Sequence, residues 1–223
     1  MINFKNQKLF EQALTHRSWV NENSKNHGTN ERLEFLGDAI LEFVVSKEIY
    51  NKFPNEEEGY LTALRANLVN TKNLAIVATN LKIGELIKLS KGEEDGGGRQ
   101  NSSLLADTVE AIIGGLYLDQ GIEASEKFIM ENIMFDVELK AKRPLKDPKS
   151  LLQEKVQAKG LAAPKYQVIS EFGPDHNKEF TIEVIIEGRP EAKGTGRSKS
   201  EAEQSAAINA LTSYCGIDLN NIE

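Results

Sequence analysis

The chain has 223 residues, of which 39% are apolar, and it carries a formal net charge of −7. This length suits one large domain or two small ones, and no stretch approaches the roughly 20 continuous apolar residues that cross a bilayer. Cys215 is the only cysteine and residues 1–5 lack a secretory h-region, so the sequence excludes an internal disulfide and a zinc knuckle and predicts a cytoplasmic protein without a membrane partner.

The first part of the chain has a helical pattern almost throughout, and we find no convincing strand in it. Asn30 and Ser102 are candidate N-caps, while Pro54 and the glycine-rich run 92–98 interrupt the pattern. That run lacks the Gly-Lys-Ser/Thr of a phosphate-binding loop, so we interpret it as a mobile loop. Helices are predicted over residues 9–21, 30–50, 57–70, 71–81, 102–118 and 121–139. The pattern predicts an all-α domain.

Acidic side chains line one face of the helix predicted from residue 30. At about 100° per residue, Glu31, Glu34 and Asp38 fall within roughly 60° of one another, and Glu42 extends the stripe. No Lys or Arg interrupts the stripe, and like charges at this spacing repel one another, more strongly where water is partly excluded. A bound cation would remove that repulsion.

A second acidic pair, Asp107 and Glu110, shares one face of the helix predicted over residues 102–118, whose remaining surface is apolar. If the two helices pack with their acidic faces together, these carboxylates meet those of Glu34 and Asp38. Carboxylate oxygens without His or Cys suit Mg²⁺ or Mn²⁺, with positions left for water and for substrate phosphate oxygens.

Two other interpretations of the acidic residues stay open. Acidic residues at helical spacing most often form a solvated face, although the apolar residues around the first stripe leave little surface for one. A di-iron carboxylate bundle would use Glu-x-x-His pairs, and His16, His27 and His176 do not have that spacing. The two motifs together favour the divalent metal site.

The charge is unevenly distributed. Residues 1–137 contain 14 Lys and Arg against 21 Asp and Glu, whereas residues 138–223 contain 13 of each sign. Basic residues crowd one short segment: Lys140, Lys142, Arg143, Lys146 and Lys149. An acidic part that holds metal and a neutral part with local basic patches can still meet a polyanion.

After the basic segment the pattern changes to a helix, three strands and a helix. Asp147 is a candidate N-cap with Pro148 at the first helical position, and a helix continues over 150–159. Ser198 is the candidate cap of an alanine-rich helix through residue 214. Strands are predicted over 165–170, 180–187 and, shorter, 191–194. This order predicts a small α+β domain with its helices on one face of the sheet.

These motifs resemble the ribonuclease III family. Residues 30–38 resemble its signature, residues 105–111 resemble its second acidic motif, and residues 13–18 also fit. The second part resembles a double-stranded RNA-binding domain, through motifs at 173–176 and 194–199. The resemblance implies an endonuclease domain at 1–138, a basic linker at 139–147, a double-stranded RNA-binding domain at 148–216 and a tail at 217–223.

The resemblance implies a Mg²⁺-dependent endoribonuclease, with Mn²⁺ as a substitute, that hydrolyses double-stranded RNA. It implies a homodimer whose two sites cut opposite strands, leaving 5′-phosphate and 3′-hydroxyl ends with short 3′ overhangs. Processing of structured precursor RNAs, ribosomal and messenger, is the implied role. The metal would lower the pKa of a bound water and neutralise the leaving 3′ oxygen. The other class we consider is a protein that binds duplex RNA without cutting it, although a binder has no need of four mutually repelling carboxylates.

Residue roles follow from the same resemblance. Glu34, Asp38, Asp107 and Glu110 match the metal carboxylates, with Asp38 and Glu110 as the main catalytic candidates. Glu31 and Glu58 match the accessory acidic positions, although Glu58 could equally belong to a solvated first helical turn. Phe35 matches the aromatic residue that the family inserts into the partner subunit, with an ordinary core position as the alternative.

For RNA contact, polar side chains must reach the shallow minor groove of an A-form duplex and phosphates across the major groove. The matching positions are Ser150, Gln153, Glu154 and Gln157 on one helix, His176 in a loop, and Arg197, Ser198 and Lys199 at the start of the last helix. Ser200 departs from the family pattern, which has a second Lys there, so we expect weaker and more salt-sensitive binding. The usual N-terminal helix before Phe4 is also missing, which bears on the outer edge of the dimer.

Overall fold

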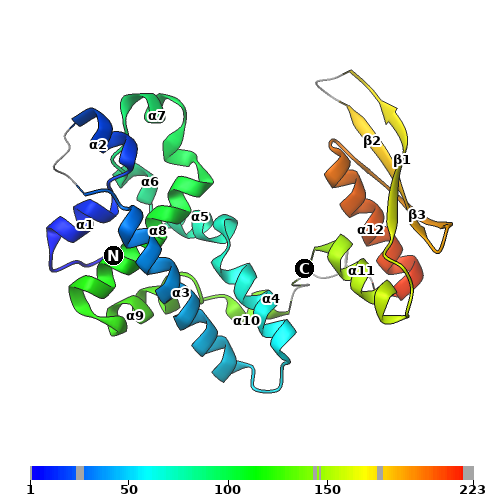
Figure 1. The fold of residues 1–223 in the computed structure, drawn as a ribbon, viewed down its shortest axis with the longest axis horizontal. Helices are drawn as coiled ribbons and strands as arrows, with labels where there is room; N and C mark the ends of the chain where they lie inside the picture. Colours follow the sequence, from blue (N-terminus) through cyan, green and yellow to red (C-terminus); the bar gives the residue numbers. More distant parts are fainter. Residues whose placement is uncertain (1, 24–27, 143–144, 146, 175–177, 218–223) are drawn as a thin grey trace. The chain divides into compact units, whose positions relative to one another are not determined.

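The computed structural model divides the chain into two compact units, residues 1–142 and 143–223, each described here by itself (Figure 1). The residues whose structure is described are 2–23, 28–142, 145, 147–174 and 178–217. None of the helices among them combines the length and the hydropathy that a membrane crossing requires.

The first unit is built from helices, as the periodicity predicts. Its helices are α1 (Gln7–Ala13), α2 (Arg17–Asn23), α3 (Glu31–Lys52), α4 (Glu58–Val69), α5 (Thr71–Asn80), α6 (Ile83–Leu86), α7 (Lys91–Asp95), the 3₁₀ helix η1 (Gly98–Gln100), α8 (Ser102–Gln120), α9 (Ile122–Asn132) and α10 (Val137–Ala141). Within the described part of this unit, the β-type pairing is an isolated bridge between Thr15 and Lys88.

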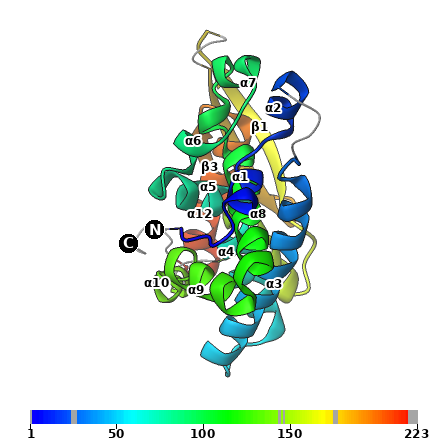
Figure 2. The same cartoon turned by 90° about the vertical axis from the view of Figure 1, so that its left-hand side faces the viewer.

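Helix α8 forms the centre of the first unit. Its sequence is apolar on almost every side, and ten of its residues are buried. Such a helix needs neighbours all round, and α8 packs against α1, α3, α5 and α9. Figure 2 shows α8 inside the unit with α3 running along it. Side chains on the small polar face of α8 are therefore held by a rigid element.

Two glycines let α3 and α8 cross at backbone contact. A methyl group on Gly37 would overlap the carbonyl oxygen of Glu110, and a methyl group on Gly114 would overlap the carbonyl oxygen of Leu33. Glycine has no Cβ and permits this approach. Glu110 of α8 is thereby placed directly against the part of α3 that carries the acidic motif.

Two predicted helices are each divided in the structure. The helix predicted over residues 9–21 is interrupted between α1 and α2, because the backbone there turns to pair with Lys88: Lys88 N donates to Leu14 O at 2.8 Å and His16 N donates to Lys88 O at 3.1 Å. The helix predicted over residues 121–139 is interrupted between α9 and α10. Pairing with a distant segment is not visible in local periodicity.

Local capping also corrects two predictions. The side chain of Asn101, rather than that of Ser102, caps α8 by accepting hydrogen bonds from Ser103 N and Leu104 N. The glycine-rich run, predicted as a loop, contains most of α7, whose cap is Ser90. Helix α3 begins after Asn30 as predicted, but the Asn30 side chain makes no capping hydrogen bond.

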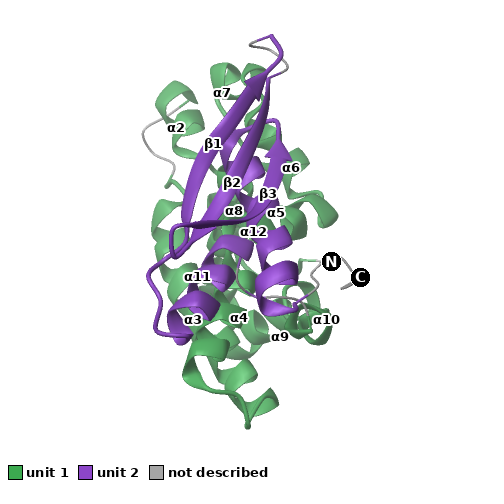
Figure 3. Cartoon of the chain, turned by 90° about the vertical axis from the view of Figure 1, so that its right-hand side faces the viewer, with its two compact units in different colours: residues 1–142 green, residues 143–223 purple. Residues whose placement is uncertain are grey.

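The second unit has the predicted order of a helix, three strands and a helix. Its elements are α11 (Pro148–Ala158), β1 (Lys165–Phe172), β2 (Glu179–Ile186), β3 (Arg189–Gly196) and α12 (Lys199–Cys215). The strands are antiparallel in the order β1-β2-β3, and both helices lie on one face of the sheet (Figure 3). The predicted caps are confirmed, since Asp147 accepts from Lys149 N and Ser150 N, and Ser198 accepts from Glu201 N.

The core of the second unit is made by alternate residues of β2 and by small residues of α12. Ile182, Val184 and Ile186 point inward, which is the period-2 pattern of a sheet with one covered face. Alanines on α12 let this helix lie close to β3, where a methyl group on Gly194 would overlap the backbone of Ala206. The opposite face of the unit's helices stays exposed.

Candidate metal centre

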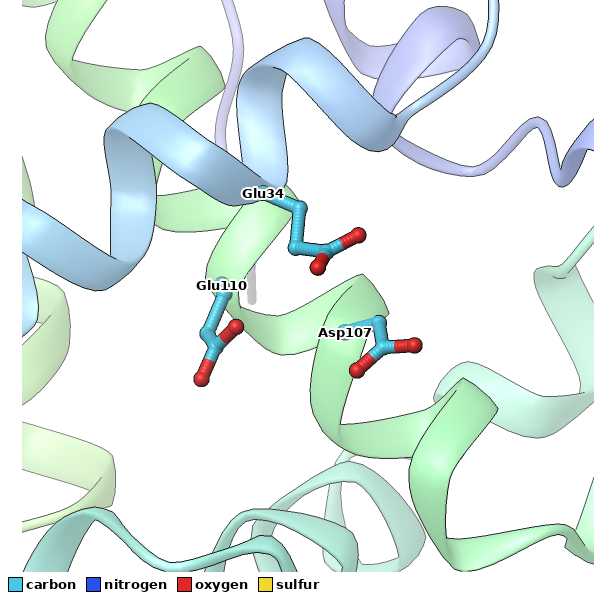
Figure 4. Close-up of side chains that lie close together, drawn as sticks. All are labelled: Glu34, Asp107 and Glu110. Atoms are coloured by element: carbon cyan, nitrogen blue, oxygen red, sulfur yellow. The ribbon is translucent and has the colours of Figure 1, made fainter.

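Three carboxylates from α3 and α8 meet where the two helices cross. Glu34 comes from the first turn of α3, and Asp107 and Glu110 come from one face of α8. One carboxylate oxygen from each residue lies within 4.8 Å of those of the other two. Figure 4 shows the three side chains directed toward a common space between the helices. The sequence pattern predicted this convergence, and the glycine crossing explains how closely it is achieved.

Burial raises the pKa of all three groups, and acidic neighbours add to the shift for Glu34 and Glu110. Burial raises the pKa of Glu110 to about 8, with further contributions from the charges of Asp38, Asp107, Glu34 and Glu42. The pKa of Glu34 is raised by burial and then by its acidic neighbours. Burial also raises the pKa of Asp107, against an opposing effect of His16. Each group is therefore held where its negative charge is unfavourable without a cation.

Asp38 lies beside this cluster and outside the group of three. It is exposed on α3, one helical turn after Glu34. Its charge is the leading electrostatic contribution to the raised pKa of Glu110 and also raises the pKa of Glu34. Asp38 thus acts electrostatically on Glu110 from outside the group of three, and it is the more accessible of the two to solvent.

The two ends of the acidic stripe on α3 have basic partners from other helices. Glu31 lies 3.7 Å from Arg17 of α2 and accepts a hydrogen bond from Thr29. Glu42 forms an ion pair with Arg65 of α4, with Nε and Oε2 2.8 Å apart. The sequence of α3 alone shows no such partners. The repulsion is therefore concentrated at the centre of the stripe, where the three clustered carboxylates lie.

Two further predicted residues lie apart from the cluster. Glu58 is exposed at the start of α4, where its carboxylate accepts a hydrogen bond from Thr62 Oγ1 at 3.0 Å. Phe35 is 81% exposed on α3. The core alternative for Phe35 is therefore wrong for the isolated chain.

The chemistry of the cluster fits a hard divalent cation. Its ligands are carboxylate oxygens, and Mg²⁺ and Mn²⁺ prefer oxygen donors and leave coordination positions to water and phosphate. A cation would also stabilise the charged form of all three partly buried carboxylates and offset the repulsion that acts on Glu34 and Glu110. The residues present therefore suit a divalent metal and leave room for a substrate anion.

Sequence reasoning missed the residues that bring the helices together and those that neutralise the end of the stripe. Gly37 and Gly114 interrupt strongly apolar helices, and a glycine inside a helix is a signal of close packing. Arg65 gave no local signal, because it reaches Glu42 only through the packing of α4 on α3.

In the second unit, the predicted contact residues of α11 share one exposed face. Ser150, Gln153, Glu154 and Gln157 are all exposed, whereas Leu152 and Val156 on the opposite side are buried in the core. Gln153 Nε2 donates to Gln157 Oε1 at 3.4 Å. The face is polar and free of large apolar groups, which suits a contact with hydroxyls and base edges.

The other predicted contact residues lie at the start of α12. Ser198 caps the helix, and Arg197 and Lys199 are exposed beside it. Lys199 Nζ lies 3.3 Å from Glu171 Oε1 and 5.6 Å from the centre of the Phe180 ring. His176, the remaining predicted contact, lies outside the described residues. The helix start thus presents cations and backbone N–H groups together, a combination that binds phosphate.

Two family models match the chain. One, described as Ribonuclease-III-like, matches residues 6–137, and the other, described as Double-stranded RNA binding motif, matches residues 148–214. Among similar proteins, Ribonuclease 3 of Geobacillus kaustophilus is 48% identical over 218 residues, which are 97% of this chain and 89% of the relative. Ribonuclease 3 of Anoxybacillus flavithermus is 50% identical over 211 residues, 94% of this chain and 89% of the relative.

Solved structures of the nuclease domain of ribonuclease III from Campylobacter jejuni resemble the first unit. One superposes with a TM-score of 0.56 at 42% identity, covering 60% of this chain and 90% of that chain, and was described for structural flexibility in a region involved in dimer formation. A second, at 2.2 Å resolution, gives a TM-score of 0.55 at 42% identity, covering 60% of this chain and 88% of that chain.

Proposed function

The chain belongs to the ribonuclease III family and is an endoribonuclease specific for double-stranded RNA, and on that premise we propose that Glu34, Asp38, Asp107 and Glu110 hold the divalent metal of its active site. The observation that carries the proposal is the meeting of Glu34, Asp107 and Glu110 within 4.8 Å, with all three pKa values raised. Asp38 and Glu110 are the catalytic residues we propose, because Asp38 is exposed to solvent beside the cluster and the pKa of Glu110 is the most strongly raised of the group.

The proposed reaction is hydrolysis of a phosphodiester bond that leaves a 5′-phosphate and a 3′-hydroxyl, with short 3′ overhangs after both strands are cut. A divalent cation bound at this site, either Mg²⁺ or Mn²⁺ as its substitute, would lower the pKa of the attacking water and neutralise charge on the leaving 3′ oxygen. The protein contributes a rigid α3–α8 crossing that fixes the carboxylates before substrate arrives, so little reorganisation is needed during the reaction. Glu31 and Glu58 are proposed as accessory positions that act through water or RNA.

Duplex RNA is proposed to bind the second unit through the exposed face of α11 and the start of α12. Ser150, Gln153, Glu154 and Gln157 would meet 2′-hydroxyls and base edges in the shallow minor groove. Arg197, Ser198 and Lys199 would meet phosphates, with His176 as a further proposed contact. These contacts read duplex shape rather than sequence, which suits an enzyme for structured RNA.

A homodimer is proposed, with the exposed apolar face of α3 as its interface. Phe35, Phe43 and Tyr50 are 81%, 59% and 70% exposed and fall on one side of the helix. Exposed aromatic residues of this size on one face are typical of interaction surfaces. Two copies would bring two metal centres to one duplex, one for each strand. Processing of precursor ribosomal and messenger RNA in the cytoplasm is the proposed role.

The experiment that tests the proposed function is incubation of the purified chain with a long RNA duplex, with Mg²⁺ and with a chelator. We expect short duplex products that carry 5′-phosphates, only when Mg²⁺ is present, and no cleavage of single-stranded RNA. A duplex that stays intact while bound to the protein, over a range of metals and salt concentrations, would contradict metal-dependent cleavage and favour a binding protein.

A further inference from the structure

The guanidinium of Arg65 crosses from α4 to α3 and is held there by two side chains. Its Nε lies 2.8 Å from Glu42 Oε2, and its Nη1 donates to Ser46 Oγ at 3.0 Å. Ser46 in turn donates to the Glu42 carbonyl oxygen at 2.6 Å. Glu42 and Ser46 are one helical turn apart on α3, so they fix both the position and the plane of the guanidinium.

This arrangement lies beside the metal centre. Glu42 follows Asp38 by four residues on the same face of α3, a separation of about 6 Å along the helix. The charge of Glu42 also acts on Glu110, whose pKa it helps to raise. The Arg65 cation is therefore placed about one helical turn beyond Asp38, on the rim of the acidic cluster.

The guanidinium keeps donors available for another ligand. Arginine has five N–H donors in a planar fork. Within the described part of the chain, the contacts of the Arg65 guanidinium are made by Nε and Nη1, and its side chain is 38% exposed. The Nη2 edge can therefore meet solvent or an anion without first losing the contacts to Glu42 and Ser46.

We propose that Arg65 contacts a phosphate of the duplex RNA next to the bond that is cleaved, and that Glu42 and Ser46 position it for that contact. This inference rests on the proposed function of the cluster. Duplex RNA is a polyanion, and it would approach a site that contains four carboxylates. Positive charge is therefore needed beside the metal in addition to the charge of the metal itself. An arginine fork held at fixed orientation matches the geometry of phosphate oxygens, and its charge-assisted hydrogen bonds are stronger than those between neutral groups.

The alternative role of Arg65 is only to neutralise Glu42. A double-mutant cycle distinguishes this role from a contact with an RNA phosphate. Arg65→Gln, Glu42→Gln and the double variant are compared with wild type for the cleavage rate of a long RNA duplex at saturating Mg²⁺, so that altered metal affinity does not enter. We expect Arg65→Gln to slow cleavage by about tenfold to a hundredfold. Glu42→Gln keeps the cation but weakens its positioning, so we expect it to slow cleavage by only about threefold, less than Arg65→Gln does, and the double variant should remain as slow as Arg65→Gln.

The salt dependence of kcat/KM gives a second measurement, and it would not change if Arg65 had a purely structural role. Loss of one phosphate contact should make the plot of log kcat/KM against log salt concentration shallower by about one. Arg65→Lys keeps the charge without the planar fork and should lie between wild type and Arg65→Gln. The matched control is Lys47→Gln, which removes an exposed cation of α3 whose nearest partner, at 2.8 Å, is Glu126 of α9. We expect this variant to cleave as wild type does.

Several results would overturn the proposal. Recovery of the wild-type rate in the double variant would mean that Arg65 only neutralises Glu42. Wild-type cleavage by Arg65→Gln, in a protein that still loses activity with Asp38→Asn, would remove the phosphate contact and leave the metal centre in place. A wild-type chain that does not cut duplex RNA at all would overturn both proposals together.

Discussion

Acidic side chains have opposite electrostatic environments in the two units. In the first unit, Glu34, Asp107 and Glu110 lie together and burial raises their pKa values, with a further contribution from acidic neighbours for Glu34 and Glu110. In the second unit, Glu171 contacts two lysines, and the hydrogen bond from Lys199 is the main cause of its lowered pKa. A carboxylate already paired with a cation needs no further ligand, whereas a partly buried group of like charges is stabilised by one. The pKa shifts of the two sets of carboxylates therefore have opposite directions in this chain.

The largest expected effect comes from neutralising a carboxylate of the proposed metal centre. Asp38→Asn and Glu110→Gln should each lower the rate of duplex cleavage by at least about a thousandfold, because a metal-centred reaction loses several kcal/mol of transition-state stabilisation. Binding of the duplex in Ca²⁺, measured by gel shift or fluorescence anisotropy, should be nearly unchanged, since the RNA-binding unit is intact.

The control for that comparison is Asp119→Asn, on the same helix as Glu110. Asp119 accepts hydrogen bonds from the backbone of Lys5 and Asn6 and is not part of the cluster. We expect it to cleave within about twofold of wild type. Full cleavage by both Asp38→Asn and Glu110→Gln would show that the acidic cluster is not the hydrolytic centre.

The next effect tests whether the helix crossing positions the cluster. In Gly37→Ala, the new methyl group meets the carbonyl of Glu110, and both helix backbones are fixed by the core. Overpacking of this kind costs about 1–3 kcal/mol, and a rigid backbone contact places the cost at the upper end. Denaturant unfolding should show the loss, and the surviving folded protein should bind Mg²⁺ more weakly.

A matched glycine makes this result interpretable. Gly59 also lies in a helix, α4, but a Cβ there would meet no atom within 4 Å. Gly59→Ala should therefore be neutral or stabilise the protein by up to about 1 kcal/mol through helix propensity. Equal stability of the Gly37 and Gly59 variants would mean that α3 and α8 do not require backbone contact.

Much of this arrangement could be predicted from the sequence, since it depends on local periodicity. The acidic faces of α3 and α8 follow from residue spacing, and the α-β-β-β-α order of the second unit follows from Asp147, Pro148 and Ser198 at the ends of clear patterns. Each of these features depends on residues that lie close together in the sequence.

What the sequence did not predict depends on contacts between distant segments. The break between α1 and α2 requires Lys88, and the neutralisation of Glu42 requires Arg65 from another helix. Gly37 and Gly114 were visible as glycines in apolar helices, but their meeting is a property of the packed pair. Acidic helix faces can thus be predicted from the local sequence, whereas the basic residues that pair with the ends of those faces, such as Arg65, cannot.

The acidity of Glu110 gives a smaller effect that depends on pH. Between its ordinary pKa of 4.5 and the folded-state value of about 8, the folded protein keeps a proton that the unfolded chain has released. Stability of the metal-free protein should therefore fall as the pH rises through this interval and level off above it. After allowance for solvent screening of a partly exposed group, we expect about 1–2 kcal/mol, or roughly 2–8 °C in Tm.

Melting curves in chelator between pH 5 and 9 provide the measurement. The raised pKa values of Glu34 and Asp107 act with the same sign, so Glu110→Gln should remove the largest part of the slope rather than all of it. Saturating Mg²⁺ should stabilise the protein most at high pH, because binding requires ionised carboxylates. Stability that rises from pH 6 to pH 8 without metal, with a slope unaffected by Glu110→Gln, would contradict the raised pKa of Glu110.

The smallest effect tests the other side of the comparison, the paired carboxylate of the RNA-binding unit. Glu171 lies 3.3 Å from Lys199 Nζ and 3.5 Å from Lys178 Nζ, so its charge opposes any phosphate that Lys199 meets. Because solvent screens an exposed ion pair, the effect should be small, and Glu171→Gln should raise the affinity for a short RNA duplex by about two- to fivefold at low salt. The control, Glu183→Gln, breaks a 3.5 Å pair with Lys193 within the sheet and should leave affinity unchanged. Weaker binding by Glu171→Gln would mean that this carboxylate serves to hold Lys199 in place, and that even a satisfied pair in this unit is part of its RNA contact.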